Sequence, residues 1–399
     1  MLLPQTPQAK DSAEMGQIDD NSAAARHRCS YLVNMEKQEF LMSGGNKEWL
    51  KGFKFIPKKL QNLNTINKLL SHQPWLLNKG HIENLTKGND SWSLSEVVHA
   101  IVILSHFHAL SSFVFGCGIN DADFDDHKFS SNGHNCEKPV DGSSQTPPSP
   151  PPPESAEVRV EELMHRMRTI SEHRINDDGS KEDLVKEFES VEIVNVDLGN
   201  GFTEDDKNKV DFLKFVEDSD FCYVDFARRK ECSAIPTFRI QDYSWDDHGF
   251  SLVNRLYSDI GNLLDAKFKT TYDLTYNTMG RKTNVDTKLF RRALWVYIQS
   301  LYGIRHDDYD YREVNLLVPR DLKGYIKTVC CFPHRVPKSG CDDVMPGFRR
   351  SEKVSQPSSS TASYFTRSSF QIHVNLMISE ARMQAELLYA LRSVMNYMK

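Results

Sequence analysis

The feature that most constrains the fold is a long apolar run at residues 97–119, VVHAIVILSHFHALSSFVFGCGI. A segment of this length is long enough to cross a bilayer. Three histidines and three serines interrupt it, and ionisable side chains are costly in the middle of a membrane. We therefore predict a buried helix at the centre of a bundle in preference to a membrane span. Ser93 and Glu96 form a capping-box pattern that predicts where this helix begins.

Helical patterns occur on both sides of this run. Apolar side chains recur at helical spacing in seven further segments, at residues 23–41, 61–70, 78–85, 249–264, 285–303, 314–327 and 374–398. Alternation typical of a strand is weak and confined to residues 191–196. We therefore predict an all-α chain.

A polar stretch separates the two helical regions. Residues 119–153 are acidic and then rich in serine and proline, and the proline tract at 147–153 cannot sustain a helix. Between Glu154 and Asp220 there are 20 acidic and 9 basic residues, which favours a mobile connector with one or two transient helices. We predict a disordered lead-in at 1–22, a partial N-terminal helical domain at 23–118, a mostly disordered linker at 119–235 and a C-terminal helical domain at 236–399.

Charge and cysteine content limit the functions that fit the chain. A net charge of −6 argues against a nucleic-acid binder, which usually has a basic face. The first residues lack a basic segment followed by an apolar one, so we expect no secretory signal. The eight cysteines form no CxxC pair, which predicts reduced thiols and a cytoplasmic protein with a nuclear pool. We find no motif that predicts a metal or a cofactor.

Cys29 is the first candidate for chemistry. Arg26, His27 and Arg28 precede it, and their positive field would favour the thiolate that reduces a peroxide. Tyr31 could donate a proton to the leaving oxygen. An ordinary buried or partly exposed cysteine is the alternative interpretation.

A second candidate site combines threonine hydroxyls with an arginine. Thr275, Thr278 and Thr287 could bind the carboxylate of a free amino acid together with Arg291. Thr287 and Arg291 are four residues apart and share a helix face. Glu352 could bind the ammonium group. Capping threonines and a surface arginine pair are the alternative.

Two further features lie in the C-terminal region. We expect the acidic-aromatic run Asp307-Asp308-Tyr309-Asp310-Tyr311 to be exposed, where it could bind a protein partner. Residues 355–372, SQPSSSTASYFTRSSFQI, have no helical period and interrupt the predicted domain. We interpret them as a surface loop or, alternatively, as a translated intron.

Both helical regions closely resemble the sestrin family. The resemblance rests on the blocks AAARHRCSYLVNM, LNTINKLLSHQPWLL, WSLSEVVHAIVILSHFHALSSFVFGCGI, PTFRIQDYSWDDHGFSLVNRLYSDIGNLLDAKF, LTYNT, VDTKLFRRALW, GIRHDDYDYREVN and EARMQAELLYALRSVM. The linker and residues 1–22 do not share in it. The resemblance begins inside the family's first domain, so we expect an N-terminally truncated member with an insertion near its C-terminus.

The resemblance implies two alkylhydroperoxidase-like helical domains joined by the disordered linker. It also implies a stress-responsive intracellular leucine sensor that negatively regulates mTOR complex 1 by binding the GATOR complex. Such a protein would respond to amino-acid starvation and to reactive oxygen species. The expected partners are leucine and GATOR subunits, with no nucleic acid, no membrane insertion and no cofactor.

The resemblance also gives roles to particular residues. The leucine contacts would be Thr275, Tyr276, Thr278, Thr287, Arg291 and Glu352, with Arg291 on the carboxylate and Glu352 on the ammonium group. The GATOR contacts would be Asp307, Asp308 and Tyr309. The peroxide-active residues would be Cys29 and, beside it, Tyr31.

Two positions and one insertion depart from the family pattern. Glu36 replaces the proton-relay histidine seven residues after the cysteine, and a carboxylate needs a strongly raised pKa to do that work. Met345 replaces the tryptophan that closes the leucine pocket, and the insertion begins three residues after Glu352. We therefore favour a binding module over an enzyme. The alternatives are a thiol-dependent alkyl hydroperoxide reductase acting through Cys29, and a damaged gene model that keeps only the partner surface.

Overall fold

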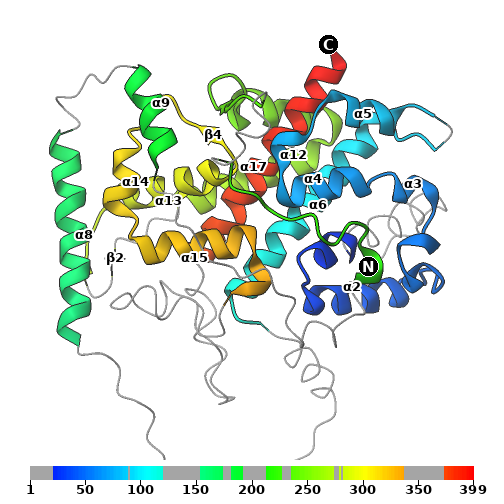
Figure 1. Cartoon of the computed structure of the whole chain (residues 1–399), viewed down its shortest axis with the longest axis horizontal. Helices are drawn as coiled ribbons and strands as arrows, with labels where there is room; N and C mark the ends of the chain where they lie inside the picture. The colour runs from blue at the N-terminus through cyan, green and yellow to red at the C-terminus, as the bar shows by residue number, and fades with distance from the viewer. Residues whose placement is uncertain are drawn as a thin grey trace, which may run out of the picture.

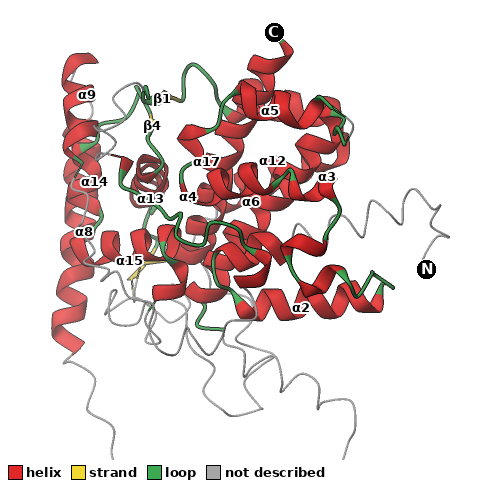
Figure 2. Cartoon of the chain, turned by 45° about the vertical axis from the view of Figure 1, so that its right-hand side comes forward, coloured by secondary structure: helices red, strands yellow, loops and turns green. Residues whose placement is uncertain are grey.

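The computed structural model describes residues 21–88, 90–119, 153–173, 181–191, 213–226, 235–273, 278–279, 282–336 and 373–399. Most of this part of the chain is helical, as the sequence predicts, and each strand in it has two residues (Figures 1 and 2). The predicted lead-in up to residue 20, the insertion at 355–372, and Met345 lie outside the described residues.

The described part of the N-terminal region contains the helices α2 to α6. They are α2 (Ser30–Met42), α3 (Lys58–Gln61), α4 (Asn64–His72), α5 (Lys79–Thr86) and α6 (Leu94–Gly116), with 3-10 turns at Trp49–Lys51, Phe53–Phe55 and Pro74–Leu76. The predicted helix at 23–41 is divided, because residues 21–26 are helical and the chain turns at His27 and Arg28 before α2 begins. Arg28 has a positive φ of 59°, a conformation that ends regular helix.

Helix α6 is the apolar run, and it lies inside the protein. The Ser93 hydroxyl accepts from the Glu96 amide at 3.2 Å, and the Glu96 carboxylate accepts from the Ser93 amide at 2.7 Å, which confirms the predicted capping box. By length and composition α6 could cross a membrane, but 67% of its most apolar window is buried in the structure. This burial agrees with a core helix.

The C-terminal region follows the predicted helices with two breaks. Its helices are α11 (Phe250–Leu256), α12 (Ser258–Asp273), α13 (Lys288–Leu301), α14 (Arg312–Leu317), α15 (Arg320–Cys331) and α17 (His373–Met398), with a π-helical turn at Trp245–Gly249 and a 3-10 turn at Pro333–Arg335. The predicted helix at 314–327 is two helices because Pro319, which has no N–H to donate, separates α14 from α15. The predicted helix at 249–264 is also divided, because the backbone of Tyr257 is not helical and separates α11 from α12.

Two short strand pairs connect the helices. The strand β1 (Phe238–Arg239) pairs in parallel with β4 (Ile304–Arg305). The strand β2 (Thr278–Met279) pairs antiparallel with β3 (Lys282–Thr283), with Thr278 opposite Thr283. The β2–β3 pair lies in the connection between α12 and α13.

The two predicted helical regions share one hydrophobic core. The larger of two clusters of buried apolar side chains contains residues of both regions, from Ala23 to Val394. Helix α17 is the centre of this arrangement, because it packs against both α6 and α13. In Figure 1, α17 runs between the blue and cyan helices of the N-terminal region and the yellow helices α13 and α14.

Part of the predicted linker is helical and packed. It contains α8 (Pro153–His173) and α9 (Lys181–Ser190), with a 3-10 turn at Leu213–Phe215. The side chains of α8 that face the core are buried, namely Val160, Leu163, Met167 and Ile170. Glu161 also pairs with Lys282 of β3 at 2.9 Å. Figure 1 shows α8 along one edge of the molecule.

Candidate functional site

Arg291 lies one turn inside α13 and joins this helix to the end of α12. Its side chain is 8% exposed. Nη2 donates to the carbonyl of Thr271 at 2.6 Å and also to that of Tyr272. These carbonyls belong to the last turn of α12, where helix geometry leaves them without an internal donor. The guanidinium therefore fixes the two helix ends relative to each other.

The second terminal nitrogen of Arg291 is not used by the contact with α12. Nη1 is buried and has no hydrogen-bond partner in the described part of the chain. Burial lowers the pKa of Arg291, although Asp273 and Tyr272 act in the opposite direction. A desolvated cation with an open donor is a favourable site for an anion, and guanidinium groups bind carboxylates with directional hydrogen bonds.

Thr287 lies directly before α13 and close to Arg291 in the same turn. It is buried, and its carbonyl accepts from the Arg291 amide at 3.0 Å. Its hydroxyl makes no capping hydrogen bond, although Thr287 occupies the N-cap position. The structure therefore brings together two of the six predicted leucine contacts. Thr278 belongs to β2, and the remaining three, Thr275, Tyr276 and Glu352, lie outside the described residues.

Asp307 lies between two arginines on the neighbouring loop. Its carboxylate is 2.6 Å from the Arg239 guanidinium and 2.8 Å from that of Arg305. Burial alone would raise the pKa of Asp307, but the hydrogen bonds from these two arginines outweigh it and lower the pKa. Since Arg239 and Arg305 are opposite each other in the β1–β4 pair, Asp307 holds the two strands together.

Asp308 is the exposed member of the acidic-aromatic run. It pairs with Arg292 at 2.9 Å and accepts from Gln241 at 3.2 Å. Tyr309 and Tyr311 are each only 1% exposed, so the prediction of an exposed aromatic surface is wrong. Their rings pack edge to face, 5.5 Å apart, and anchor the loop in the core.

Cys29 lies in a second, smaller apolar cluster. It is 1% exposed and packs with Ala24, Leu32, Val114 and Phe215 among others, while Tyr31 is partly buried against the same cluster. Since Cys29 is buried in this cluster, a peroxide would have to enter the core to reach the thiol. Peroxide reduction by Cys29 stays a prediction.

Arg26 and His27, which precede Cys29, form hydrogen bonds with residues far from it in the sequence. Arg26 donates to the Asn64 side chain at 2.8 Å and to the carbonyl of Glu217 at 2.6 Å. Burial, reinforced by nearby Arg382, lowers the pKa of His27 well below 6.5 and keeps the imidazole neutral. The expectation that His27 adds positive charge beside Cys29 is therefore wrong.

Glu36 has the raised pKa that acid–base work would require. It is 4% exposed on the buried side of α2. Burial, with a smaller contribution from Glu39, raises its pKa from 4.5 to about 7. Glu36 lies seven residues beyond Cys29, which places it about 10 Å along the helix axis.

The sequence did not predict a network of polar side chains in the middle of the core. Arg382 and Glu386 of α17 are fully buried and bind to each other. Glu386 also contacts His108 of α6 at 2.7 Å. One feature of the sequence could have indicated this network, namely that Arg382 and Glu386 both lie within the apolar pattern of α17. In the described residues no group of three or more histidine, cysteine or acidic side chains is placed to hold a metal ion.

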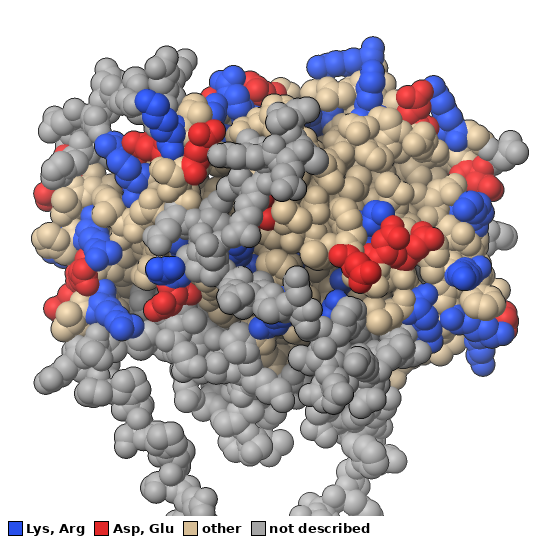
Figure 3. Space-filling view, in the orientation of Figure 1, with Lys and Arg blue, Asp and Glu red and all other residues tan. Residues whose placement is uncertain are grey.

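Charged side chains of both signs are intermingled on the surface. Figure 3 shows lysine and arginine next to aspartate and glutamate at several places around this face of the molecule. On this face, the described residues form no continuous basic area.

Comparison with known proteins identifies the family of the chain. The family model described as PA26 p53-induced protein (sestrin) matches residues 22–357 and 358–398. The chain is 45% identical to Sestrin-3 of Mus musculus, over 94% of this chain and 77% of the relative. It is 46% identical to Sestrin-2 of Homo sapiens and 43% identical to the sestrin homolog of Drosophila melanogaster, over 94% of this chain and 75% and 84% of those relatives. The chain therefore belongs to the sestrin family.

Proposed function

We propose that this sestrin-type, stress-induced protein is a leucine sensor that restrains mTOR complex 1 by binding the GATOR complex. The observation that carries the proposal is the buried Arg291 guanidinium at the start of α13, whose Nη1 has no hydrogen-bond partner among the described residues. In this proposal the protein acts in the cytoplasm, with a nuclear pool, and responds to amino-acid starvation and to oxidative stress.

The chemistry of the Arg291 site suits a free amino acid. Arg291 would bind the carboxylate, and Glu352 the ammonium group. The buried side chain of Met279, in the same connection between α12 and α13, would contribute apolar surface. Each charge-assisted hydrogen bond contributes roughly 1.5–3 kcal/mol, so a few of them give about micromolar affinity after the costs of association. Such an affinity suits sensing.

Two consecutive arginines would couple leucine to the partner surface. Arg291 reaches the end of α12, while Arg292 pairs with Asp308 and lies over the Tyr309 ring at 5.2 Å. A ligand that moves the first turn of α13 would therefore shift the loop that holds Asp307 and Asp308. Coupling of this kind is reciprocal, so GATOR binding would also lower the affinity for leucine.

Isothermal calorimetry with leucine tests the proposal. We expect saturable binding to the unmutated chain and at least tenfold weaker binding after Arg291→Gln. Arg292→Gln is the matched control, because it removes the neighbouring guanidinium, which pairs with Asp308. Its affinity for leucine should stay within about threefold. Absence of heat at millimolar leucine, or equal affinity in Arg291→Gln, would refute the proposal.

Thiol-dependent reduction of alkyl hydroperoxides by Cys29 is a second candidate function. The raised pKa of Glu36 favours it, because a carboxyl group that titrates near pH 7 can exchange protons at that pH. The test is turnover of an alkyl hydroperoxide by the unmutated chain, Cys29→Ser and Glu36→Gln. Turnover that disappears in Cys29→Ser supports this function, and an inactive unmutated chain excludes it.

A further inference from the structure

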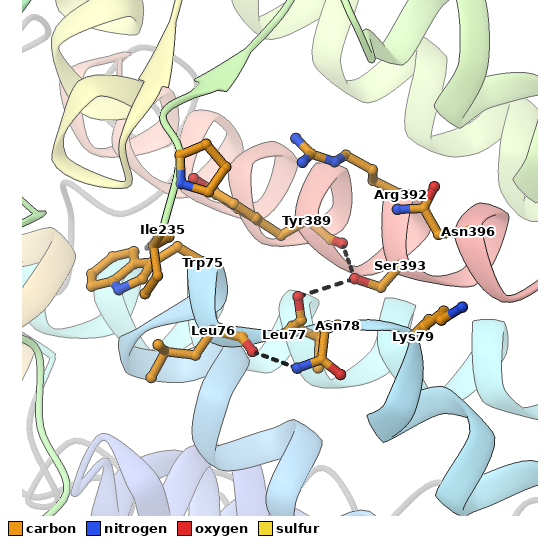
Figure 4. A pocket seen from close by; sticks show the side chains of 11 residues that line it. Trp75, Leu76, Leu77, Asn78, Lys79, Ile235, Tyr389, Arg392, Ser393 and Asn396 are labelled. Carbon is orange, nitrogen blue, oxygen red and sulfur yellow. Dashed lines mark hydrogen bonds between the residues drawn. The ribbon is translucent and has the colours of Figure 1, made fainter. Parts of the chain in front are cut away.

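A pocket of about 650 Å³ opens between the start of α5, the last turns of α17 and residues 235–236 (Figure 4). This volume lies in the usual range of small-molecule sites. Its lining shares no residue with the Arg291 site or with the run Asp307–Tyr311. The pocket is therefore a separate site from the one proposed for leucine.

One end of the pocket is apolar and rigid. Trp75, Leu76 and Ile235 lie together at this end in Figure 4. The Trp75 ring is fixed by edge-to-face contacts with Tyr223, at 6.0 Å, and Phe226, at 5.4 Å. A preformed apolar wall of this kind can bind an apolar group without first becoming ordered.

The rest of the pocket contains two cationic side chains. Its described lining includes Arg392 and Lys79 but no aspartate or glutamate. The Arg392 guanidinium lies over the Phe238 ring at 4.6 Å, which orients it. Neither Arg392 nor Lys79 has a carboxylate within ion-pair distance in the part of the chain that the structure describes.

Two other polar side chains of the pocket are already used within the protein. The Ser393 hydroxyl donates to the carbonyls of Leu77, at 3.3 Å, and Tyr389, at 3.0 Å. The Asn78 side chain caps α5 by accepting from the Gly80 amide at 2.9 Å. Arg392 and Lys79 are the cationic groups of the lining, and only the exposed Asn396 amide would add a further neutral donor.

We propose that this pocket binds a small amphipathic anion, namely a monocarboxylate with an unbranched apolar body such as a medium-chain fatty acid. The apolar body would lie against Trp75, Leu76 and Ile235, and the carboxylate would accept hydrogen bonds from Arg392. Lys79 would add positive charge near the solvent. A free amino acid does not suit the pocket, because its ammonium group would find no carboxylate in the described lining.

Calorimetry with decanoate, below its aggregation concentration, tests the proposal. We expect saturable binding of one decanoate per chain, and at least tenfold weaker binding of decanol, which has the same chain but no charge. Decyl phosphate distinguishes the two head groups, and the proposal expects it to bind no more tightly than decanoate. Saturating leucine should leave decanoate binding unchanged, so that this site and the leucine site are tested separately.

Two substitutions locate the ligand. Arg392→Gln should weaken decanoate binding roughly tenfold or more, since it removes charge-assisted hydrogen bonds. Arg255→Gln is the matched control, because Arg255 lies in α11, outside the pocket lining, and should bind decanoate as the unmutated chain does. Leu76→Ser, at the apolar end, should also weaken binding if both ends contribute. Absence of saturable decanoate binding, equal affinity for decanol, tighter binding of decyl phosphate, or an unaltered Arg392→Gln would each overturn the proposal.

Discussion

Arg382 and Glu386 form an ion pair in the centre of the molecule, with 2.9 Å between Nε and Oε1 and no exposed surface on either side chain. Arg382 also donates to the Ser112 hydroxyl at 2.6 Å and to the carbonyl of Cys330 at 2.7 Å. Its Nη2 lies 2.8 Å from Nε2 of His27. The pair thus connects α17 with α6, with α15 and with the turn before α2.

Removing one partner of this pair should strongly destabilise the fold. A buried charge that loses its counter-ion costs about 3–5 kcal/mol, whereas exposed pairs contribute about 1 kcal/mol or less. We therefore expect Arg382→Met or Glu386→Gln to lower the free energy of unfolding in urea by about 3 kcal/mol or more. The double variant Arg382→Met/Glu386→Met should lose less than the sum of the two corresponding single changes.

The exposed pair Glu83–Lys87 is the matched control, because it has the same four-residue spacing on a helix. Glu83→Gln should change the free energy of unfolding by less than about 1 kcal/mol. A loss from Arg382→Met as small as that from Glu83→Gln would contradict the assigned role of the buried pair.

Glu36 should make stability depend on pH. Burial raises its pKa from 4.5 to about 7, so the folded chain keeps a proton that the unfolded chain releases between these values. Stability contributed by this group is therefore present below pH 4.5 and is lost as the pH rises to about 7. Glu36→Gln should stabilise the protein at pH 8 by up to about 3 kcal/mol, and little at pH 4.5.

Urea unfolding at both pH values measures this effect. The difference between the unmutated chain and Glu36→Gln isolates Glu36 from the buried histidines, which titrate with the opposite sign. Glu39→Gln, on an exposed position of the same helix, should keep most of the pH dependence. A stabilisation by Glu36→Gln that is equal at the two pH values would show that its carboxyl titrates normally.

Burial should protect Cys29 from thiol reagents. Cys29 is buried, whereas Cys222 is exposed, so the chain contains its own reference. Iodoacetamide under native conditions should label Cys222 at least tenfold faster than Cys29, and the difference should vanish in urea. Peptide mass mapping measures the extent of labelling at Cys29 and at Cys222. Rapid native labelling of Cys29 would instead indicate an open route to the thiol.

Local sequence patterns predicted the helices well but not their contacts. The apolar period and the Ser93–Glu96 capping box located α6, because both depend on residues within a few positions of each other. Pro319 divides a predicted helix, and its missing N–H could have indicated that break. The burial of Tyr311 could not be predicted from local sequence patterns. Its ring packs at 5.1 Å against Phe188 of α9, which lies in the predicted linker.

The candidate sites show the same limit. Thr287 and Arg291 lie in one helical turn, as their four-residue spacing predicts. The open nitrogen of Arg291 depends instead on the end of α12, twenty residues earlier in the chain. The pocket around Arg392 combines three distant segments, and no local pattern brings Trp75 and Ile235 to it.

The most direct test of the central claim is capture of the purified GATOR complex by this chain, with and without saturating leucine. The proposal predicts that leucine releases the complex from the unmutated chain but not from Arg291→Gln, which should bind GATOR equally in both conditions. Asp308→Ala should reduce capture in both conditions, because it removes the exposed carboxylate of the loop. A complex that persists with the unmutated chain at saturating leucine, or no capture without leucine, would contradict the account.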